Sequence, residues 1–126
     1  MNEIIVEKNE DEEGSIPHIW RPIFKKIVKA FVEKDYKLSS SIENVSSISE
    51  NTAKQIKEYI EDYGEELIEL PETTWKTSVY IYYGEYWNVL IDLFTKEGNR
   101  SDLVLNVEVR EIDKEYIFKV RLVYIP

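Results

Sequence analysis

The sequence predicts an α+β fold in which two N-terminal helices pack on one face of a four-stranded antiparallel meander. The second half of the chain carries four apolar runs that alternate with period two, as half-buried strands do. The connections between successive runs are short, and a parallel crossover needs a dozen or more residues, so neighbouring runs must pair antiparallel. In the first half, apolar residues recur at helical spacing in two stretches. The four runs are Thr77–Tyr83, Trp87–Thr95, Leu103–Glu111 and Tyr116–Ile125.

Residues 1–14 are expected to form a flexible acidic arm, and residues 15–126 a single α+β domain. The arm carries six acidic residues against Lys8 and few apolar side chains, and such charge runs are usually solvated. The remaining chain is long enough to bury roughly two-thirds of the surface that it exposes when unfolded. It contains no cysteine, so it must do this without disulfides.

The first helix is predicted to follow Ser15, whose hydroxyl can cap it. Pro17 suits a first turn, but Pro22 lacks the N–H of a ladder hydrogen bond, so the helix should begin or kink near Arg21. Lysines lie on the side opposite the apolar residues. The apolar stripe comprises Ile19, Trp20, Ile23, Phe24, Ile27, Val28, Phe31 and Val32.

The second helix is predicted after a serine-rich connector over residues 35–49. Ser49 can cap its start, and Gly64 can end it in a left-handed conformation. Glu65–Leu70 alternates loosely before Pro71 and favours a short edge strand. The apolar stripe of this helix is narrower and comprises Ala53, Ile56, Tyr59, Ile60 and Tyr63.

Alternation along the four runs predicts which side chains face the helices and which form an open face, because an antiparallel sheet can leave one face to solvent. The helix-covered residues are expected to be Val79, Ile81, Tyr83, Trp87, Val89, Ile91, Leu93, Leu103, Leu105, Val107, Val109, Phe118, Val120, Leu122 and Tyr124. The open face would carry Tyr80, Tyr82, Asn88, Leu90, Asp92, Phe94, Val104, Asn106, Glu108, Arg110, Lys119 and Arg121.

The charge distribution argues against a nucleic-acid partner. The net charge is −9, and residues 50–69 carry seven acids against Lys54 and Lys57. Nucleic acid repels such a chain unless cations are concentrated, and the one basic stretch is a helix face over residues 15–34. An acidic surface instead favours a basic protein partner and speeds their encounter. Solubility alone explains the same charge about equally well.

No motif for catalysis or cofactor binding is present in the sequence. The chain has one histidine, His18, and no cysteine, so transition-metal sites of the usual kind are not expected. It contains neither a Gly-x-Ser-x-Gly elbow nor a glycine-rich phosphate loop. We therefore expect a protein that is not an enzyme and needs no cofactor or metal. The N-terminus lacks the pattern of a signal peptide, and no apolar run approaches the ~20 residues of a membrane span, which favours a cytoplasmic location without membrane association.

Asp92 is the acidic residue whose setting in the sequence is least ordinary. It lies within an apolar strand pattern, where a carboxylate needs a partner. Arg110, Arg121 or Lys119 could supply that partner across the sheet. A structural ion pair is the favoured interpretation of Asp92, Arg110 and Arg121, and a ligand-binding site is the alternative.

Two segments of the sequence resemble a small family of uncharacterised bacterial domains. The family has an Asp-Leu-aromatic-Thr strand, which Asp92-Leu93-Phe94-Thr95 matches, and a Glu-Gly-Arg-Ser-Asp-Leu turn. Here the turn is Glu97-Gly98-Asn99-Arg100-Ser101-Asp102-Leu103, with Asn99 inserted, and Tyr124-Ile125-Pro126 matches the aliphatic–proline ending. The resemblance covers roughly residues 17–126. It implies a compact acidic protein like the immunity partners of bacterial toxins, without an established activity.

The function predicted from these features is non-enzymatic binding, most concretely by an immunity-type inhibitor that occludes the basic surface of a cognate toxin. Tyrosines concentrate at such interfaces, although aromatic pairs that only stabilise the sheet explain the tyrosine cluster equally well. Acidic groups steer the formation of the complex. A small-ligand or peptide module that uses the open sheet face is the alternative, and an enzyme built around Asp92 is the least favoured. The oligomeric state is not predicted. The expected partner-binding residues are Glu58, Glu61, Asp62, Glu65, Glu66, Tyr80, Tyr82 and Tyr86.

Overall fold

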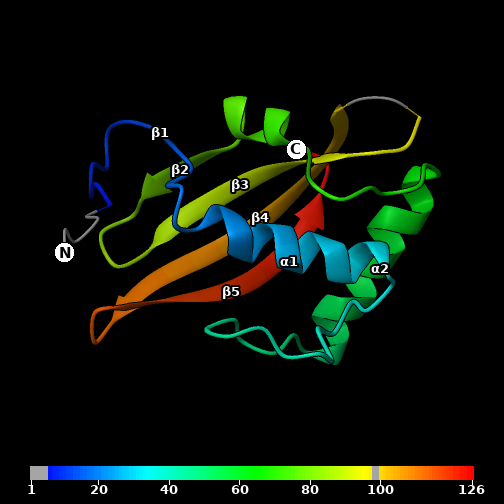
Figure 1. The fold of residues 1–126 in the computed structure, drawn as a ribbon, viewed down its shortest axis with the longest axis horizontal. Helices are drawn as coiled ribbons and strands as arrows, with labels where there is room; N and C mark the ends of the chain where they lie inside the picture. The colour runs from blue at the N-terminus through cyan, green and yellow to red at the C-terminus, as the bar shows by residue number, and fades with distance from the viewer. Residues whose placement is uncertain (1–5, 98–99) are drawn as a thin grey trace.

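The computed structural model describes residues 6–97 and 100–126 and has an α+β fold, as predicted. The described strands form one sheet in the order β1-β2-β3-β4-β5, with every neighbouring pair antiparallel. Figure 1 shows both helices on the same side of this sheet. The elements are β1 (Gly14–Ser15), α1 (Arg21–Val32), α2 (Glu50–Tyr63), the 3₁₀ helix η1 (Glu72–Lys76), β2 (Val79–Tyr82), β3 (Trp87–Phe94), β4 (Arg100–Ile112) and β5 (Glu115–Tyr124).

The described sheet has five strands rather than the predicted four, because Gly14 and Ser15 pair with β2. Two residues are too few to give an alternating pattern, so the sequence carries no signal for β1. Gly14 lies against the ring of Tyr80, and a Cβ at position 14 would approach that ring to 2.2 Å. Glycine therefore permits the close approach that forms this edge strand.

The segment before β1, which the sequence assigns to a flexible arm, contacts the domain through Val6, Glu7 and Lys8, the last of which pairs with Glu111. Val6 is buried in the core cluster, and the carbonyl of Glu7 accepts a hydrogen bond from Trp87 Nε1 at 2.9 Å. The domain boundary at residue 15 stays a prediction, but these are the contacts of a segment packed on the domain. Residues 1–5 lie outside the described residues.

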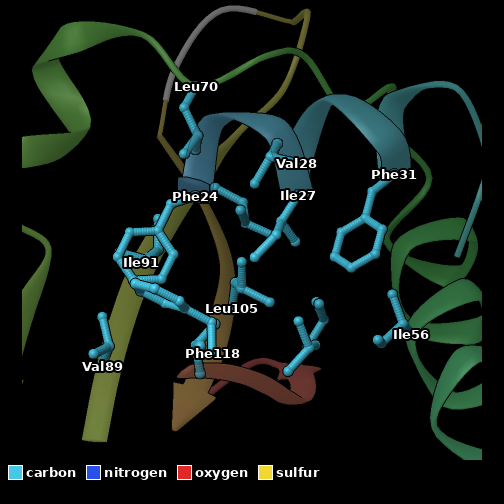
Figure 2. Packing of buried hydrophobic residues seen from close by; sticks show 14 of the residues in the cluster. Phe24, Ile27, Val28, Phe31, Ile56, Leu70, Val89, Ile91, Leu105 and Phe118 are labelled. Atoms are coloured by element: carbon cyan, nitrogen blue, oxygen red, sulfur yellow. The ribbon is translucent and has the colours of Figure 1, made fainter. Parts of the chain in front are cut away.

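Helix α1 begins at Arg21, where Pro22 predicts a start. Ser15 is part of β1 and does not cap it; Trp20 occupies the cap position without a side-chain hydrogen bond. Figure 2 shows the buried residues of α1 pointing toward the sheet, where Ile91, Leu105 and Phe118 lie. The α1 residues in this contact are Phe24, Ile27, Val28 and Phe31.

Helix α2 has both predicted end residues. The Ser49 hydroxyl accepts a hydrogen bond from the Thr52 N–H at 3.2 Å, and Gly64 is left-handed with φ 81°. Ala53, Ile56 and Ile60 are buried against the sheet side of the core. The Glu65–Leu70 segment is not a strand; only Leu67 forms an isolated bridge, to Thr95.

Two register features change the predicted faces of the sheet. Tyr80 pairs with Val89 and Tyr82 with Trp87, so both tyrosines face the helices while Val79 and Ile81 face the open side. The β2–β3 turn closes with a hydrogen bond from the Tyr83 N–H to the Tyr86 carbonyl at 2.8 Å, and its even length reverses the predicted parity of β2.

The second feature is a β-bulge in β5. Asn106 pairs with Leu122 and Val107 with Val120, so Arg121 is an extra residue in β5. After this bulge Val123 is the buried residue, and Leu122 and Tyr124 lie opposite open-face residues of β4. The prediction that Leu122 and Tyr124 face the helices is therefore wrong.

Candidate partner-binding surface

Five of the predicted acidic residues lie together at the C-terminal end of α2. Gly64 reverses the chain there, and the returning segment bonds to the end of β3 and the residues after it. The Ile68 N–H donates to the Phe94 carbonyl at 3.0 Å, and the Lys96 N–H donates to the Glu66 carbonyl at 2.7 Å. The reversal brings residues of α2 and of the next segment to one edge of the molecule. We call this group the acidic end; it consists of Glu58, Glu61, Asp62, Glu65 and Glu66.

The acids of the acidic end differ in how far they are neutralised. Glu65 accepts a hydrogen bond from the Thr95 hydroxyl at 2.6 Å. Glu66 and Glu58 have lysine partners, at 3.5 Å to Lys96 and 3.9 Å to Lys54. Within residues 6–97 and 100–126, Glu61 and Asp62 have no ion pair or hydrogen bond through their carboxylates. These two carboxylates are therefore available to a partner.

The peptide dipoles of the helices add to the negative potential at this end. The last turn of α2 contains Glu61 and Asp62 and no basic residue, and the C-terminus of a helix carries a partial negative charge. Helix α1 ends at the same place, because Val32 and Gly64 line one hollow of about 340 Å³. The hollow is lined by Phe31, Val32, Lys34, Tyr36, Ile60, Glu61, Gly64, Glu65, Glu66 and Leu67.

The side chain of Tyr36 lines this hollow, and its pKa is shifted by its surroundings. Burial and the neighbouring Glu61 carboxylate raise the pKa of its phenol above the ordinary value of 10.0. The phenol O–H can donate a hydrogen bond to a ligand or partner.

A second hollow of about 290 Å³ flanks the opposite side of the α2 end and is lined by Tyr59, Asp62, Tyr63 and Ile125. Tyr59 is 43% exposed and Ile125 50% exposed. The Tyr63 hydroxyl accepts a hydrogen bond from the Asp102 N–H at 3.1 Å, which holds that ring against β4. Sequence reasoning assigned both tyrosines to the core stripe and missed this surface. Their i, i+4 spacing next to an acid was the available signal.

The tyrosines predicted to bind a partner lie elsewhere. Tyr80 is 9% exposed and contacts Trp20 edge to face, and Tyr82 packs on Trp87 with ring centroids 5.0 Å apart. Tyr86 lies in the β2–β3 turn, and Figure 1 shows that turn at the opposite end of the sheet from the end of α2. The structure therefore does not bring the predicted tyrosines and the predicted acids into one surface.

Arg110 and Arg121 are paired with Glu108 rather than with Asp92. Arg110 Nε lies 2.6 Å and Arg121 Nη1 2.9 Å from the Glu108 carboxylate, and Glu108 is only 7% exposed. Burial would raise the pKa of Glu108, but the hydrogen bonds and charges of the two arginines outweigh it and hold this pKa below the ordinary 4.5. With both guanidinium groups engaged, this part of the open face is a structural ion-pair network.

Asp92 has other partners, so its predicted pairing with Arg110 or Arg121 is wrong. It lies opposite Val104, which is on the same face as Glu108 but four residues away along β4. Its carboxylate accepts a hydrogen bond from the Thr77 hydroxyl, and Arg100 lies 4.0 Å away. The sequence shows the need for a partner but does not give the register that selects one.

The residues that carry the family resemblance form structural hydrogen bonds where β3 ends and β4 begins. The backbone of Asp92 bonds to two buried hydroxyls: its carbonyl accepts from Thr74 at 2.7 Å and its N–H donates to Ser78 at 3.0 Å. Ser101 donates to the Leu93 carbonyl at 2.8 Å and accepts from the Leu103 N–H at 3.1 Å, which fixes the β3–β4 register. Gly98 and Asn99 of the predicted turn lie outside the described residues.

Comparison with known families decides where the chain belongs. The model of a domain of unknown function, DUF7668, matches residues 28–126. The chain belongs to this family. The match contains the whole of the acidic end and both hollows, and it starts within α1. No curated protein and no solved structure matches the chain.

The described residues contain neither a metal-binding cluster nor a membrane-spanning helix. In the part of the chain that the structure describes, no group of three or more histidine, cysteine, aspartate or glutamate side chains is arranged to hold a metal ion. The helices within the same residues are all too short or too polar to cross a membrane. His18, the single histidine, is exposed just before α1.

Proposed function

We propose that this DUF7668 protein is a non-enzymatic binding protein that recognises a basic protein partner through its acidic end. The observation that carries this proposal is the convergence at one edge of the C-termini of both helices, two hollows, and two carboxylates that have no partner among the described residues. Such a surface attracts cations over a distance and offers concave contacts once they arrive.

The partner we propose is a toxin domain, which the protein would inhibit as an immunity-type partner. This rests on the resemblance of the 92–103 region and the C-terminus to compact acidic domains of that kind, and on the net charge of −9. An inhibitor of this type needs only to cover a basic surface. A steered association is useful to it because fast capture limits damage by the toxin.

The test mixes the purified full-length protein with the purified product of the adjacent gene and measures the association rate as the salt concentration rises. The Debye length falls from about 30 Å at 0.01 M salt to about 8 Å at 0.15 M. The association rate constant should fall by roughly tenfold or more over this range, because screening removes the steering. The free energy of unfolding, measured over the same range, is the control for salt effects on the fold.

The inhibitor role has its own readout. Expression of the full-length protein should restore growth to cells that produce the adjacent gene product, if that product is toxic. Binding without restored growth would support the binding function and contradict the immunity role. No binding at low salt, or turnover of a small molecule by the isolated protein, would contradict the proposal as a whole.

The open sheet face supports a second candidate function, the binding of a peptide or small ligand. Leu90, Phe94 and Leu122 are only half buried there, and in Figure 1 the two α-helices of the described residues both lie on the other side of the sheet. Leu90→Lys would place a charge at the centre of this face. A ligand lost by Leu90→Lys but kept by charge reversal at Glu61 and Asp62 would favour this second function.

A further inference from the structure

The hollow formed by Tyr59, Asp62, Tyr63 and Ile125 has a composition that selects for one kind of group. Positions 59, 62 and 63 are spaced i, i+3 and i+4, so α2 presents two phenol rings and a carboxylate on one side. Ile125, which follows β5, lines the hollow with an apolar side chain. The site therefore combines aromatic walls, an apolar wall and one negative charge.

The charge in this hollow is not compensated. Asp62 has no cationic partner within the described residues, and it lies in the last turn of α2, where the helix itself is partially negative and carries no base. A carboxylate at this end of a helix is electrostatically unfavourable, and a bound cation would relieve that cost. An anionic ligand is excluded on the same ground.

The walls of the hollow add a second preference. Tyrosine faces attract a guanidinium or an ammonium group, and the attraction grows as water is removed. The aliphatic stem of such a side chain can contact Ile125, which is half exposed. A planar guanidinium can stack on a ring and donate to a carboxylate at the same time, whereas an ammonium group is a strongly hydrated point charge.

We propose that this hollow binds an arginine side chain of the basic partner, as an anchor at the centre of the interface. This deepens the proposed function and rests on it for the identity of the partner. The neighbouring hollow between the helix ends is less suited, because Lys34 lines it and Glu65 and Glu66 already have partners. Aromatic and arginine anchors of this kind commonly dominate the binding energy of interfaces.

The experiment titrates the full-length protein with N-acetyl-arginine methylamide and follows the ring signals of Tyr59 and Tyr63 by NMR. We expect saturable shifts at these rings and at Ile125. The norleucine analogue, which has an apolar stem and no charge, should give no saturable shift, and the lysine analogue should bind more weakly. Asp62→Asn should weaken arginine binding roughly 3- to 5-fold, as expected for a partly exposed ion pair.

Two substitutions complete the design. Tyr59→Ala removes one wall of the hollow at an exposed position and should also weaken binding several-fold, while Glu115→Gln, at the far end of the sheet, should leave it unchanged. Equal binding of the norleucine analogue, or no effect of Asp62→Asn, would overturn the proposal. If the protein binds arginine but no basic partner, the proposed function is refuted and the site stands. If it binds the basic partner but not arginine, the site alone is refuted.

Discussion

At the scale of single residues, Glu108 is a buried carboxylate that holds two arginines of the open face in place. Its carboxylate is bonded to Arg110 and Arg121, and its pKa is held below the ordinary 4.5. The folded-state pKa is thus lower than the unfolded one, so the ion pairs add stability at neutral pH. This stability is lost as the pH falls from near 4.5 through the folded-state pKa.

Glu108→Gln should therefore lower the free energy of unfolding at pH 7 by about 1–3 kcal/mol, as expected for hydrogen bonds to charged groups. Denaturant unfolding of the two proteins at pH 7 and again below pH 4 measures the change. The difference should shrink at the lower pH. Glu111→Gln is the matched control, because Glu111 lies on the same strand in an exposed pair with Lys8; an equal loss in both variants would contradict the role of burial.

At the scale of elements, α1 packs on the sheet through Phe24, next to the ring contacts that Trp20 makes from the cap position. Phe24 is fully buried, and its ring meets Phe118 edge to face with centroids 5.6 Å apart. Phe24→Ala should cost about 3–5 kcal/mol and leave the protein unfolded or severely weakened. Thermal unfolding followed by circular dichroism tests this. Lys26→Ala, on the exposed side of the same helix, should change the melting temperature little; similar losses would contradict the packing of α1.

The segment before β1 is the element for which sequence and structure lead to opposite expectations. Its charge run predicts that deleting residues 1–13 leaves stability unchanged. The burial of Val6 and the bond between Glu7 and Trp87 predict a loss of about 2–4 kcal/mol and a melting temperature lower by at least about 5 °C. Differential scanning calorimetry decides between them. Glu13→Ala in the full chain controls for lost charge, and an unchanged melting temperature after deletion would restore the flexible-arm interpretation.

Much of the architecture could be predicted from periodicity. Local patterns that tertiary packing reinforces give both helices, with the start of α1 at Arg21 and the end of α2 at Gly64. They also give the order of strands β2 to β5. β1 could not be predicted because two residues have no period, and the face of β2 could not because turn length sets its parity. A single extra residue, Arg121, moved the buried position in β5 to Val123.

The candidate site was predictable in part for a related reason. The grouping of the acids was predictable because they are close together in sequence: residues 58–66 span the end of α2 and the turn after it. The tyrosines of β2 looked like an interface because tyrosine suits both interfaces and cores. Register decides between the two, and it places Tyr80 and Tyr82 inward. Ile125, far away in sequence, joins Tyr59 only in the folded chain.

At the scale of the whole molecule, acidic residues occupy both ends of the sheet, so net charge alone does not locate a binding surface. The α2 end has Glu61 and Asp62; the end with the β2–β3 and β4–β5 turns has Glu85 and Glu115. All four are exposed. What distinguishes the α2 end is that two helices finish there beside two hollows.

This difference permits a comparison at constant net charge. Two double variants change the net charge by the same amount, from −9 to −5. The first combines Glu61→Lys with Asp62→Lys, and the second combines Glu85→Lys with Glu115→Lys. The most direct measurement is the association rate constant of each with the basic partner at low salt. The first variant should associate roughly tenfold more slowly than the unaltered protein and the second only slightly more slowly. Equal slowing by both, or greater slowing by the second, would contradict the acidic end as the partner-binding surface.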